Sequence, residues 1–332
     1  MSANQQLPLF DIFAGIGGFS LALQPEFRTV AYCEREPAAI AVLQKNMKSG
    51  RLHQAPIYAD VLQLTEKDFN HHKPFVISMG FPCQDISHVK KEPDGIHGAR
   101  SGTIFHVIDI AKRCPYVRMM LIENSPALRF RGLDLLKRKL TTAGFKLSWG
   151  IFGACDVASP QRRLRWFGVA FRAANDFSKI PRFQLSNTWK AEPRLCRTVC
   201  KTAAIIQRLE LLGNAVVPAC ARFAFANIVQ HNGAVEEVVF KHVYDHLPLL
   251  TMKYPNGEVA TRHGWSTPVK TQSNPCHRPS HACNWLLTGN VLYVNEEPQC
   301  GTAENPAINP MWLEWLQGYP ANYTAAGRTR KV

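Results

Sequence analysis

Short apolar runs alternate with helix-like segments through the first half of the chain, and this alternation constrains the fold more than any other feature. Each run is bounded by turn residues and has the length of a single strand. The strand-like runs are residues 9–13, 29–33, 57–60, 75–79, 119–122, 145–149 and 164–170. Such alternation is typical of a parallel sheet covered by helices. We therefore predict an α/β fold.

Charge is distributed unevenly along the 332 residues. The formal net charge is +14, and residues 112–208 alone hold 20 Lys+Arg against 5 Asp+Glu. A concentrated basic stretch is expected on a face that follows a polyphosphate backbone. A soluble protein with a generally basic surface is the weaker interpretation. With 46% hydrophobic residues, the chain has enough apolar side chains for one large domain and a smaller one.

The composition also bears on the compartment. No apolar run approaches about 18 residues, so we expect no membrane span. Residues 1–6 lack the basic and apolar regions of a signal peptide. Ten cysteines in such a chain are expected to be reduced thiols. These features predict a cytoplasmic protein.

One cysteine, Cys83, follows an apolar run directly within the turn Gly80-Phe81-Pro82-Cys83-Gln84. The carboxyl end of a parallel strand is where open α/β sheets bind their ligands. A thiolate there, favoured by backbone N–H groups, is a nucleophile. The alternative is that Cys83 is one buried thiol among ten.

A glycine-rich turn, Gly15-Ile16-Gly17-Gly18, follows the first strand-like run. Glycines let the backbone approach a ligand closely, and the spacing differs from the Gly-x-Gly-x-x-Gly pattern of NAD and FAD sites. Glu34 and Asp60 end the next two runs, where carboxylates can bind ribose hydroxyls. This arrangement predicts a nucleoside cofactor without phosphates; the alternative is that both are solvated loop carboxylates.

Taken together, these segments resemble the DNA cytosine-5 methyltransferase family. The matching segments, which cover most of residues 7–228, are Asp11–Gly18, Gly80–Ser87, Glu123-Asn124, Gln161–Arg165 and Gly213–Pro218. The resemblance implies a class I (Rossmann-like) methyltransferase fold, a mixed sheet with helices on both faces, and a smaller loop-rich target-recognition domain. It also implies S-adenosyl-L-methionine as cofactor and a cytosine flipped out of duplex DNA.

The resemblance further implies a role for each matching residue. Cys83 adds to ring C6, Glu123 supplies a proton or donor to N3, and Arg163 and Arg165 hold the flipped nucleotide. Residues 84–102 form a loop that closes on the substrate. The expected substrate-binding residues are Gln84, Ser87, Gln161 and Arg162. The expected cofactor-binding residues are Asp11, Phe13, Gly15, Gly17, Gly18, Glu34, Asp60, Pro82, Asn214 and Val216.

The order of segments departs from the family pattern. Residues 171–206 are too few for a target-recognition region, whereas Asn309–Pro320 resembles a segment that usually precedes Gly-Asn-x-Val. We predict a rearranged chain. Its expected parts are a catalytic cofactor-binding domain (1–171 and 205–229), a connecting segment (172–204) and a DNA-reading domain (230–332).

Two other functions and one metal site compete with this interpretation. An RNA (tRNA) cytosine-5 methyltransferase shares these motifs, but the Cys-Phe-Thr element of that branch is absent. A catalytically silent DNA-binding homologue has no chemical reason to keep Cys83, Glu123 and Arg165. The cluster Cys276, His277, His281 and Cys283 matches no common zinc finger, so we expect no metal. We expect an active monomer with duplex DNA as partner.

Overall fold

A computed structural model describes most of the first 240 residues and parts of the remainder. The described residues are 6–82, 102–157, 159, 161, 163–185, 197–198, 203–240, 250–253, 259–262, 285–288, 291–294, 307–308 and 310–325.

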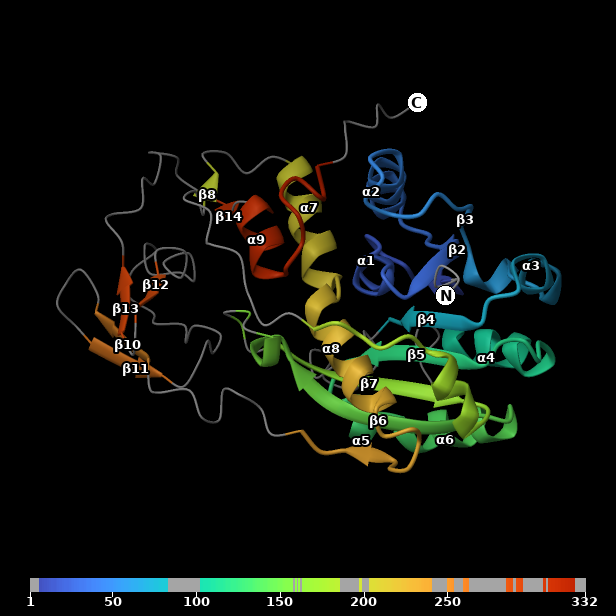
Figure 1. Ribbon diagram of the computed structural model, residues 1–332. Helices are drawn as coiled ribbons and strands as arrows, with labels where there is room; N and C mark the ends of the chain where they lie inside the picture. Colours follow the sequence, from blue (N-terminus) through green and yellow to red (C-terminus); the bar gives the residue numbers. More distant parts are fainter. Residues whose placement is uncertain are drawn as a thin grey trace, which may run out of the picture.

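An eight-stranded sheet forms the body of the protein, in the order β3-β2-β1-β4-β5-β7-β6-β9 (Figure 1). Its strands are β1 (Leu7–Ile12), β2 (Phe27–Cys33), β3 (Ile57–Tyr58), β4 (Val76–Gly80), β5 (Met119–Asn124), β6 (Lys146–Gly153), β7 (Leu164–Phe171) and β9 (Glu237–Val238). Neighbours from β3 to β5 are parallel, whereas β7 is antiparallel to β5 and β6. The predicted strands and the mixed α/β sheet are confirmed.

Helices cover both faces of this sheet (Figure 1). The helices of the described residues are α1 (Gly18–Leu23), α2 (Pro37–Lys48), α3 (Glu66–His72), α4 (Thr103–Arg113), α5 (Leu128–Arg131), α6 (Leu133–Thr142), α7 (Ala203–Asn214), α8 (Pro218–Val229) and α9 (Pro310–Leu316), of which α7 and α9 pack against each other. Side chains of a strand alternate between faces. Accordingly, Met120 and Ile122 pack with α3, α4 and α6, whereas Met119 and Leu121 pack with α1 and α8. Burial on both faces explains why the strands are continuously apolar.

Residues 230–332, predicted as one module, contribute to more than one part of the structure. Strand β9 pairs in parallel with β6, so the main sheet continues past the expected boundary at residue 229. Helix α9 lies beside α7 (Figure 1). Between β9 and α9 in the sequence, four strands form a separate sheet in the order β11-β10-β13-β12; they are β10 (Leu250–Lys253), β11 (Val259–Arg262), β12 (Trp285–Thr288) and β13 (Val291–Val294). A two-stranded ladder joins β8 (Arg197–Thr198) to β14 (Ala307–Ile308).

The segment Ala203–Val229 is long and apolar enough to cross a membrane, but length and composition alone are weak evidence for a membrane span. The segment is two helices, since α7 ends at Asn214 and α8 begins at Pro218. Helix α8 buries Ala221, Phe225 and Ile228 completely in the core beside the sheet. The apolar composition of α8 is therefore explained by its packing.

Candidate active site at the carboxyl edge of the sheet

The matching segments meet at one edge of the sheet. Strands β1, β2, β4 and β5 all end there, and β7 begins there because it runs antiparallel. The register pairs Gly80 of β4 with Glu123 of β5, and Glu123 with Phe167 of β7. The turn Phe81-Pro82 and the start of β7 are thus brought to opposite sides of Glu123.

The glycine turn between β1 and α1 is unusually bent. Phe13, Gly15 and Gly17 all have positive φ, at 57°, 53° and 85°. Such a value is uncommon for a phenylalanine and typical of functional turns. A Cβ added at Gly15 would meet no atom within 4 Å, so this side of the turn is open to a ligand. At Gly18 a Cβ would lie 2.6 Å from Cγ1 of Val216, so there glycine is required by packing.

Asp11 lies behind the turn. Its carboxylate has no exposed surface, and it accepts hydrogen bonds from Ser20 (Oγ 2.7 Å, N 3.2 Å) and from Ser78 Oγ (2.7 Å). Burial raises the pKa of Asp11 to about 6, although these hydrogen bonds oppose the rise. Asp11 is predicted to contact a cofactor, and in the structure its oxygens fix α1 and β4 to the end of β1.

The two other carboxylates predicted for a nucleoside are half-buried at the same edge. Glu34 Oε2 accepts a hydrogen bond from the Gly15 amide at 2.7 Å, and Oε1 accepts from the amides of Arg35 and Glu36 at 2.8 Å. Asp60 Oδ1 accepts from the Leu62 amide at 3.0 Å. A carboxylate has about four acceptor positions, so Glu34 retains one for a ribose hydroxyl. The open face of Gly15 and these acceptors fit a non-phosphorylated nucleoside.

Glu123 and Arg165 form an ion pair at the centre of the edge. Arg165 Nε lies 3.2 Å from Glu123 Oε1, and both side chains keep some exposure, 29% and 15%. Burial raises the pKa of Glu123, whereas the nearby charges of Arg165 and Arg163 lower it. The net effect is a raised pKa of Glu123, which makes the protonated form, the one that donates a hydrogen bond or proton, more accessible.

Asn124 follows Glu123 and fixes the turn that leads to Cys83. Its buried side chain donates from Nδ2 to the Phe81 carbonyl at 3.0 Å and accepts from the Ser125 amide at 2.8 Å. Our sequence reasoning gave Asn124 no role, although it lay within a matching segment. The signal available was its position directly after an acidic residue at a strand end.

Two side chains predicted to hold substrate are engaged within the protein. Arg163 Nη2 donates to the carbonyls of Gly213 (3.0 Å) and Ala215 (2.6 Å), and Gln161 Nε2 donates to the carbonyl of Leu316 (2.7 Å). Burial and Arg165 lower the pKa of Arg163 to about 10. Its buried Nε has no partner among the described residues. Arg163 thus braces the turn between α7 and α8.

That turn carries two predicted cofactor residues. Asn214 is exposed at the end of α7. Val216 is half-buried and contacts Gly18, which brings the turn against the glycine loop. Two tyrosines from beyond α9, which the sequence reasoning missed, complete this contact: Tyr319 donates to the Val216 carbonyl at 2.8 Å, and Tyr323 donates to the Ile16 carbonyl at 2.9 Å.

Several predicted residues lie outside the described part of the chain. These are Cys83, Gln84, Ser87, Arg162, most of the loop 84–102, and the cysteines and histidines of 276–283. Pro82 is the last described residue before Cys83, and it is half-buried. Among the described residues, no group of three or more His, Cys, Asp or Glu could hold a metal ion.

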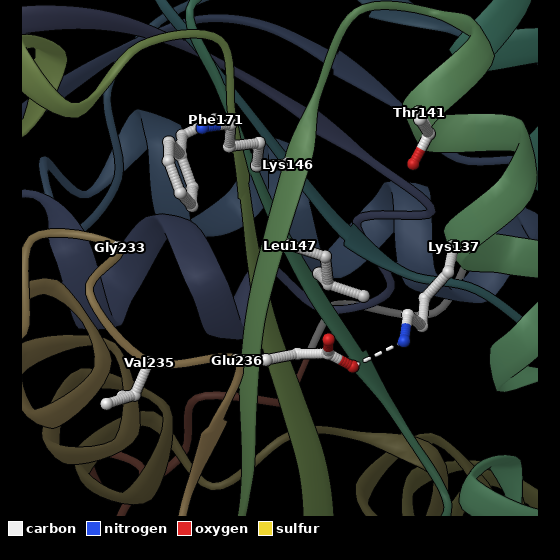
Figure 2. A pocket seen from close by; sticks show the side chains of 8 residues that line it. All are labelled: Lys137, Thr141, Lys146, Leu147, Phe171, Gly233, Val235 and Glu236. Atoms are coloured by element: carbon white, nitrogen blue, oxygen red, sulfur yellow. Dashed lines mark hydrogen bonds and ion pairs between the residues drawn. The ribbon is translucent and has the colours of Figure 1, made fainter.

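A separate cleft of about 290 Å³ lies at the opposite ends of the strands, where β6 begins and β7 ends (Figure 2). Lys137 reaches across it to Glu236, with Nζ and Oε1 2.5 Å apart. Phe171, which lines this cleft, pairs with Met119 at the start of β5, whereas Glu123 lies toward the end of β5. The cleft therefore takes no part in the site around Glu123.

Comparison with known proteins relates the whole chain to one family. A family model described as C-5 cytosine-specific DNA methylase matches residues 7–332. The type II methyltransferase M2.BsuMI of Bacillus subtilis is 30% identical over 170 residues, covering 48% of this chain and 40% of the relative. M.HhaI of Haemophilus parahaemolyticus is 30% identical over 183 residues, covering 54% and 52%. The chain thus spans about half the length of these curated relatives or less.

Among solved structures, S. pombe Dnmt2 methyltransferase aligns with a TM-score of 0.42 and 24% identity, covering 50% of this chain and 51% of its own. Entamoeba histolytica methyltransferase EhMeth aligns at 0.47 and 18%, covering 57% and 58%.

Proposed function

Because the chain belongs to the C-5 cytosine-specific DNA methylase family, we propose that it methylates C5 of a cytosine in duplex DNA, with S-adenosyl-L-methionine as cofactor. The observation that carries the proposal is the Glu123–Arg165 pair, 3.2 Å apart at the strand end next to the turn that leads to Cys83. A carboxyl with a raised pKa in this position is suited to donate a proton to cytosine N3 during attack on the ring.

Four groups of this chain would hold the cofactor. The open side of Gly15 admits the ligand close to the backbone, Glu34 and Asp60 accept hydrogen bonds from the nucleoside, and Val216 closes the pocket beside Gly18. Asp11 and Arg163 act at a distance, since each fixes one of the two chain segments that form the pocket. When bound, S-adenosyl-L-methionine supplies the methyl group that C5 takes up.

The protein's own residues prepare C5 for that transfer. The thiolate of Cys83 forms a bond to C6, and the electron pair of the C5–C6 bond moves toward C5 and N3 while Glu123 donates its proton to N3. After methylation, a base removes the C5 proton, the Cys83–C6 bond breaks, and Glu123 recovers the N3 proton. These steps regenerate the thiolate and the protonated carboxyl, and the product is 5-methylcytosine.

Arg165 has two tasks in this scheme. Its Nε holds the Glu123 carboxyl at the edge, and its remaining N–H groups suit the base carbonyl or a phosphate of the flipped nucleotide. Its Nη1 donates to the carbonyl of Leu164 at 2.8 Å, which fixes the plane of the guanidinium. A guanidinium held in this way orients the carboxyl toward a base rather than into the core.

DNA binding is assigned to two regions of different character. The basic stretch 112–208 holds the phosphates, since it contains 20 Lys+Arg and only 5 Asp+Glu. The sheet β10–β13 and its connections read base edges and give sequence specificity, while the protein acts as a monomer in the cytoplasm. Full sequence selectivity in a chain without residues 241–306 would contradict this assignment.

Covalent trapping tests the proposed reaction. Duplex DNA with 5-fluorocytosine at its target cannot lose a proton from C5, so the Cys83–C6 bond persists and the adduct survives denaturing electrophoresis. We expect an adduct that requires S-adenosyl-L-methionine and disappears in Cys83→Ser. Absence of an adduct on any DNA would contradict the proposal, and an adduct formed only with fluorinated RNA would favour the tRNA methyltransferase alternative.

A further inference from the structure

Residues 310–325, which we call the C-terminal clasp, are braced internally by one buried carboxylate. Glu314 has no exposed surface. Its Oε2 accepts a hydrogen bond from the Asn322 amide at 2.7 Å, and its Oε1 accepts from the amide and hydroxyl of Thr324 at 2.7 and 2.5 Å. Arg208 of α7 pairs with the same carboxylate at 3.0 Å. The clasp is therefore an ordered unit fixed to α7.

The clasp is also bound to the segments on either side of the glycine turn. Asn46 of α2 donates to the Tyr323 carbonyl at 3.1 Å, and Lys45 donates to the Asn322 carbonyl. On α7, Gln317 donates to the Leu212 carbonyl at 3.0 Å. These bonds span α2 and α7, so the clasp bridges the two halves of the pocket.

Two tyrosine hydroxyls of the clasp bind the pocket backbone itself. Tyr323 donates to the carbonyl of Ile16, inside the glycine turn, and Tyr319 donates to the carbonyl of Val216. The two rings pack with their centroids 4.8 Å apart, and both side chains are buried. A Cβ at Gly18 would lie 2.5 Å from the Tyr319 hydroxyl, so turn and clasp are in direct contact.

We propose that the clasp is a part of the cofactor site, with Tyr319 and Tyr323 as positioning residues that fix the glycine turn and the Val216 turn for S-adenosyl-L-methionine. The inference rests on the proposed function, since it concerns the cofactor named there. It places in the cofactor site a segment that follows the sheet β10–β13 in the sequence and was therefore predicted to belong to the DNA-reading domain. Neither tyrosine touches the reacting atoms; each acts through a backbone carbonyl.

The hydroxyls suit this task because they remain neutral donors. Burial raises the pKa of both tyrosines far above the ordinary value for a phenol. The residue Ile16 is only 2% exposed, so water has little access to its carbonyl as a substitute donor. Loss of the Tyr323 hydroxyl therefore leaves the turn without that restraint.

Full-length Tyr323→Phe and Tyr319→Phe variants test the inference, with Tyr116→Phe as matched control. Tyr116 also uses its hydroxyl in one hydrogen bond, to Asn70 Oδ1 at 2.8 Å, far along the chain from the pocket. The readouts are calorimetric Kd values for S-adenosyl-L-methionine and S-adenosylhomocysteine, the Kd for DNA, and KM and kcat. We expect Kd and KM for the cofactor to rise about three- to tenfold in Tyr323→Phe, with kcat and the Kd for DNA unchanged, and no rise in Tyr116→Phe.

Each contrary result has a separate meaning. Cofactor Kd values in Tyr323→Phe and Tyr319→Phe equal to those of Tyr116→Phe would overturn the role of the clasp and leave the proposed function intact. Failure of the unaltered protein to bind either compound would overturn the proposed function, and the clasp inference with it. A Glu314→Gln variant loosens the clasp from within, and it must weaken cofactor binding by at least as much as Tyr323→Phe does.

Discussion

Arg165 Nε lies 3.2 Å from Glu123 Oε1 at the carboxyl end of β5. Burial raises the pKa of the Glu123 carboxyl, and the charge of Arg165 opposes this rise. Because Glu123 acts in its protonated form, activity is present below its pKa and falls as the pH rises through it.

Replacement of Arg165 by Met is expected to move the alkaline limb of the kcat/KM profile to higher pH, because the charge that lowers the Glu123 pKa is removed. The maximum rate falls, since the guanidinium also contacts the nucleotide. Glu123→Gln loses about 100-fold or more in kcat and lacks that limb. A limb in Arg165→Met that stays in place or moves to lower pH would contradict the assignment of Glu123.

Asp11→Asn is expected to change how stability depends on pH. The folded-state pKa of Asp11, about 6, exceeds the ordinary value of 3.8, so the native state holds the proton more tightly and this contribution to stability falls as pH rises from about 4 to 6. The variant lacks the titration. Its free energy of unfolding relative to the unaltered protein therefore increases across that window, by about 1–3 kcal/mol. Denaturant titrations at half-unit pH steps measure the difference, and parallel curves would contradict it.

Gly15→Ala is expected to weaken cofactor binding, and Gly50→Ala is its matched control. Both glycines have positive φ, 53° and 72°, and neither would place a Cβ within 4 Å of another atom. The backbone strain is then similar, about 1–2 kcal/mol of stability for each. Only Gly15 lies at the pocket, so only Gly15→Ala raises the cofactor Kd. Equal Kd values for the two variants would place the ligand elsewhere.

Lysine variants of Arg163 and Arg165 are expected to differ in whether they lose stability or activity. Arg163→Lys loses the Nη2 bonds to Gly213 and Ala215 and lowers the free energy of unfolding by about 1–3 kcal/mol. Arg165→Lys keeps most of the stability and loses kcat, because lysine cannot reproduce a planar, bidentate donor. Thermal unfolding and steady-state kinetics on both variants make the comparison; the reverse pattern would exchange their roles.

The sequence predicted the sheet well because its signals are local. Runs such as Val76–Met79 are apolar throughout since both faces of β4 are covered, and glycine and proline mark the ends. The same rule explains why Glu123 lies beside the turn before Cys83, because the parallel strands β4 and β5 end together. The ion pair with Arg165 then follows from the antiparallel pairing of β5 and β7.

What the sequence did not reveal depends on contacts between distant segments. Asp11 was expected to face a ligand, but Ser20 and Ser78 occupy its carboxylate, and Ser78 reaches it only through the pairing of β1 with β4. Arg163 is predicted to hold substrate, and the sequence did not reveal that its Nη2 donates to the carbonyls of Gly213 and Ala215. No periodicity or spacing links Tyr323 to Ile16.

The hydrogen bond from Tyr323 to Ile16 joins residues 307 positions apart. During synthesis the glycine turn leaves the ribosome early, yet its last restraint arrives only when residue 323 has been added. A growing chain therefore passes through a long period in which the sheet can form while the pocket is open on one side. The restraint on the glycine turn is therefore added only after residues 112–208, which carry the basic stretch, have been synthesised.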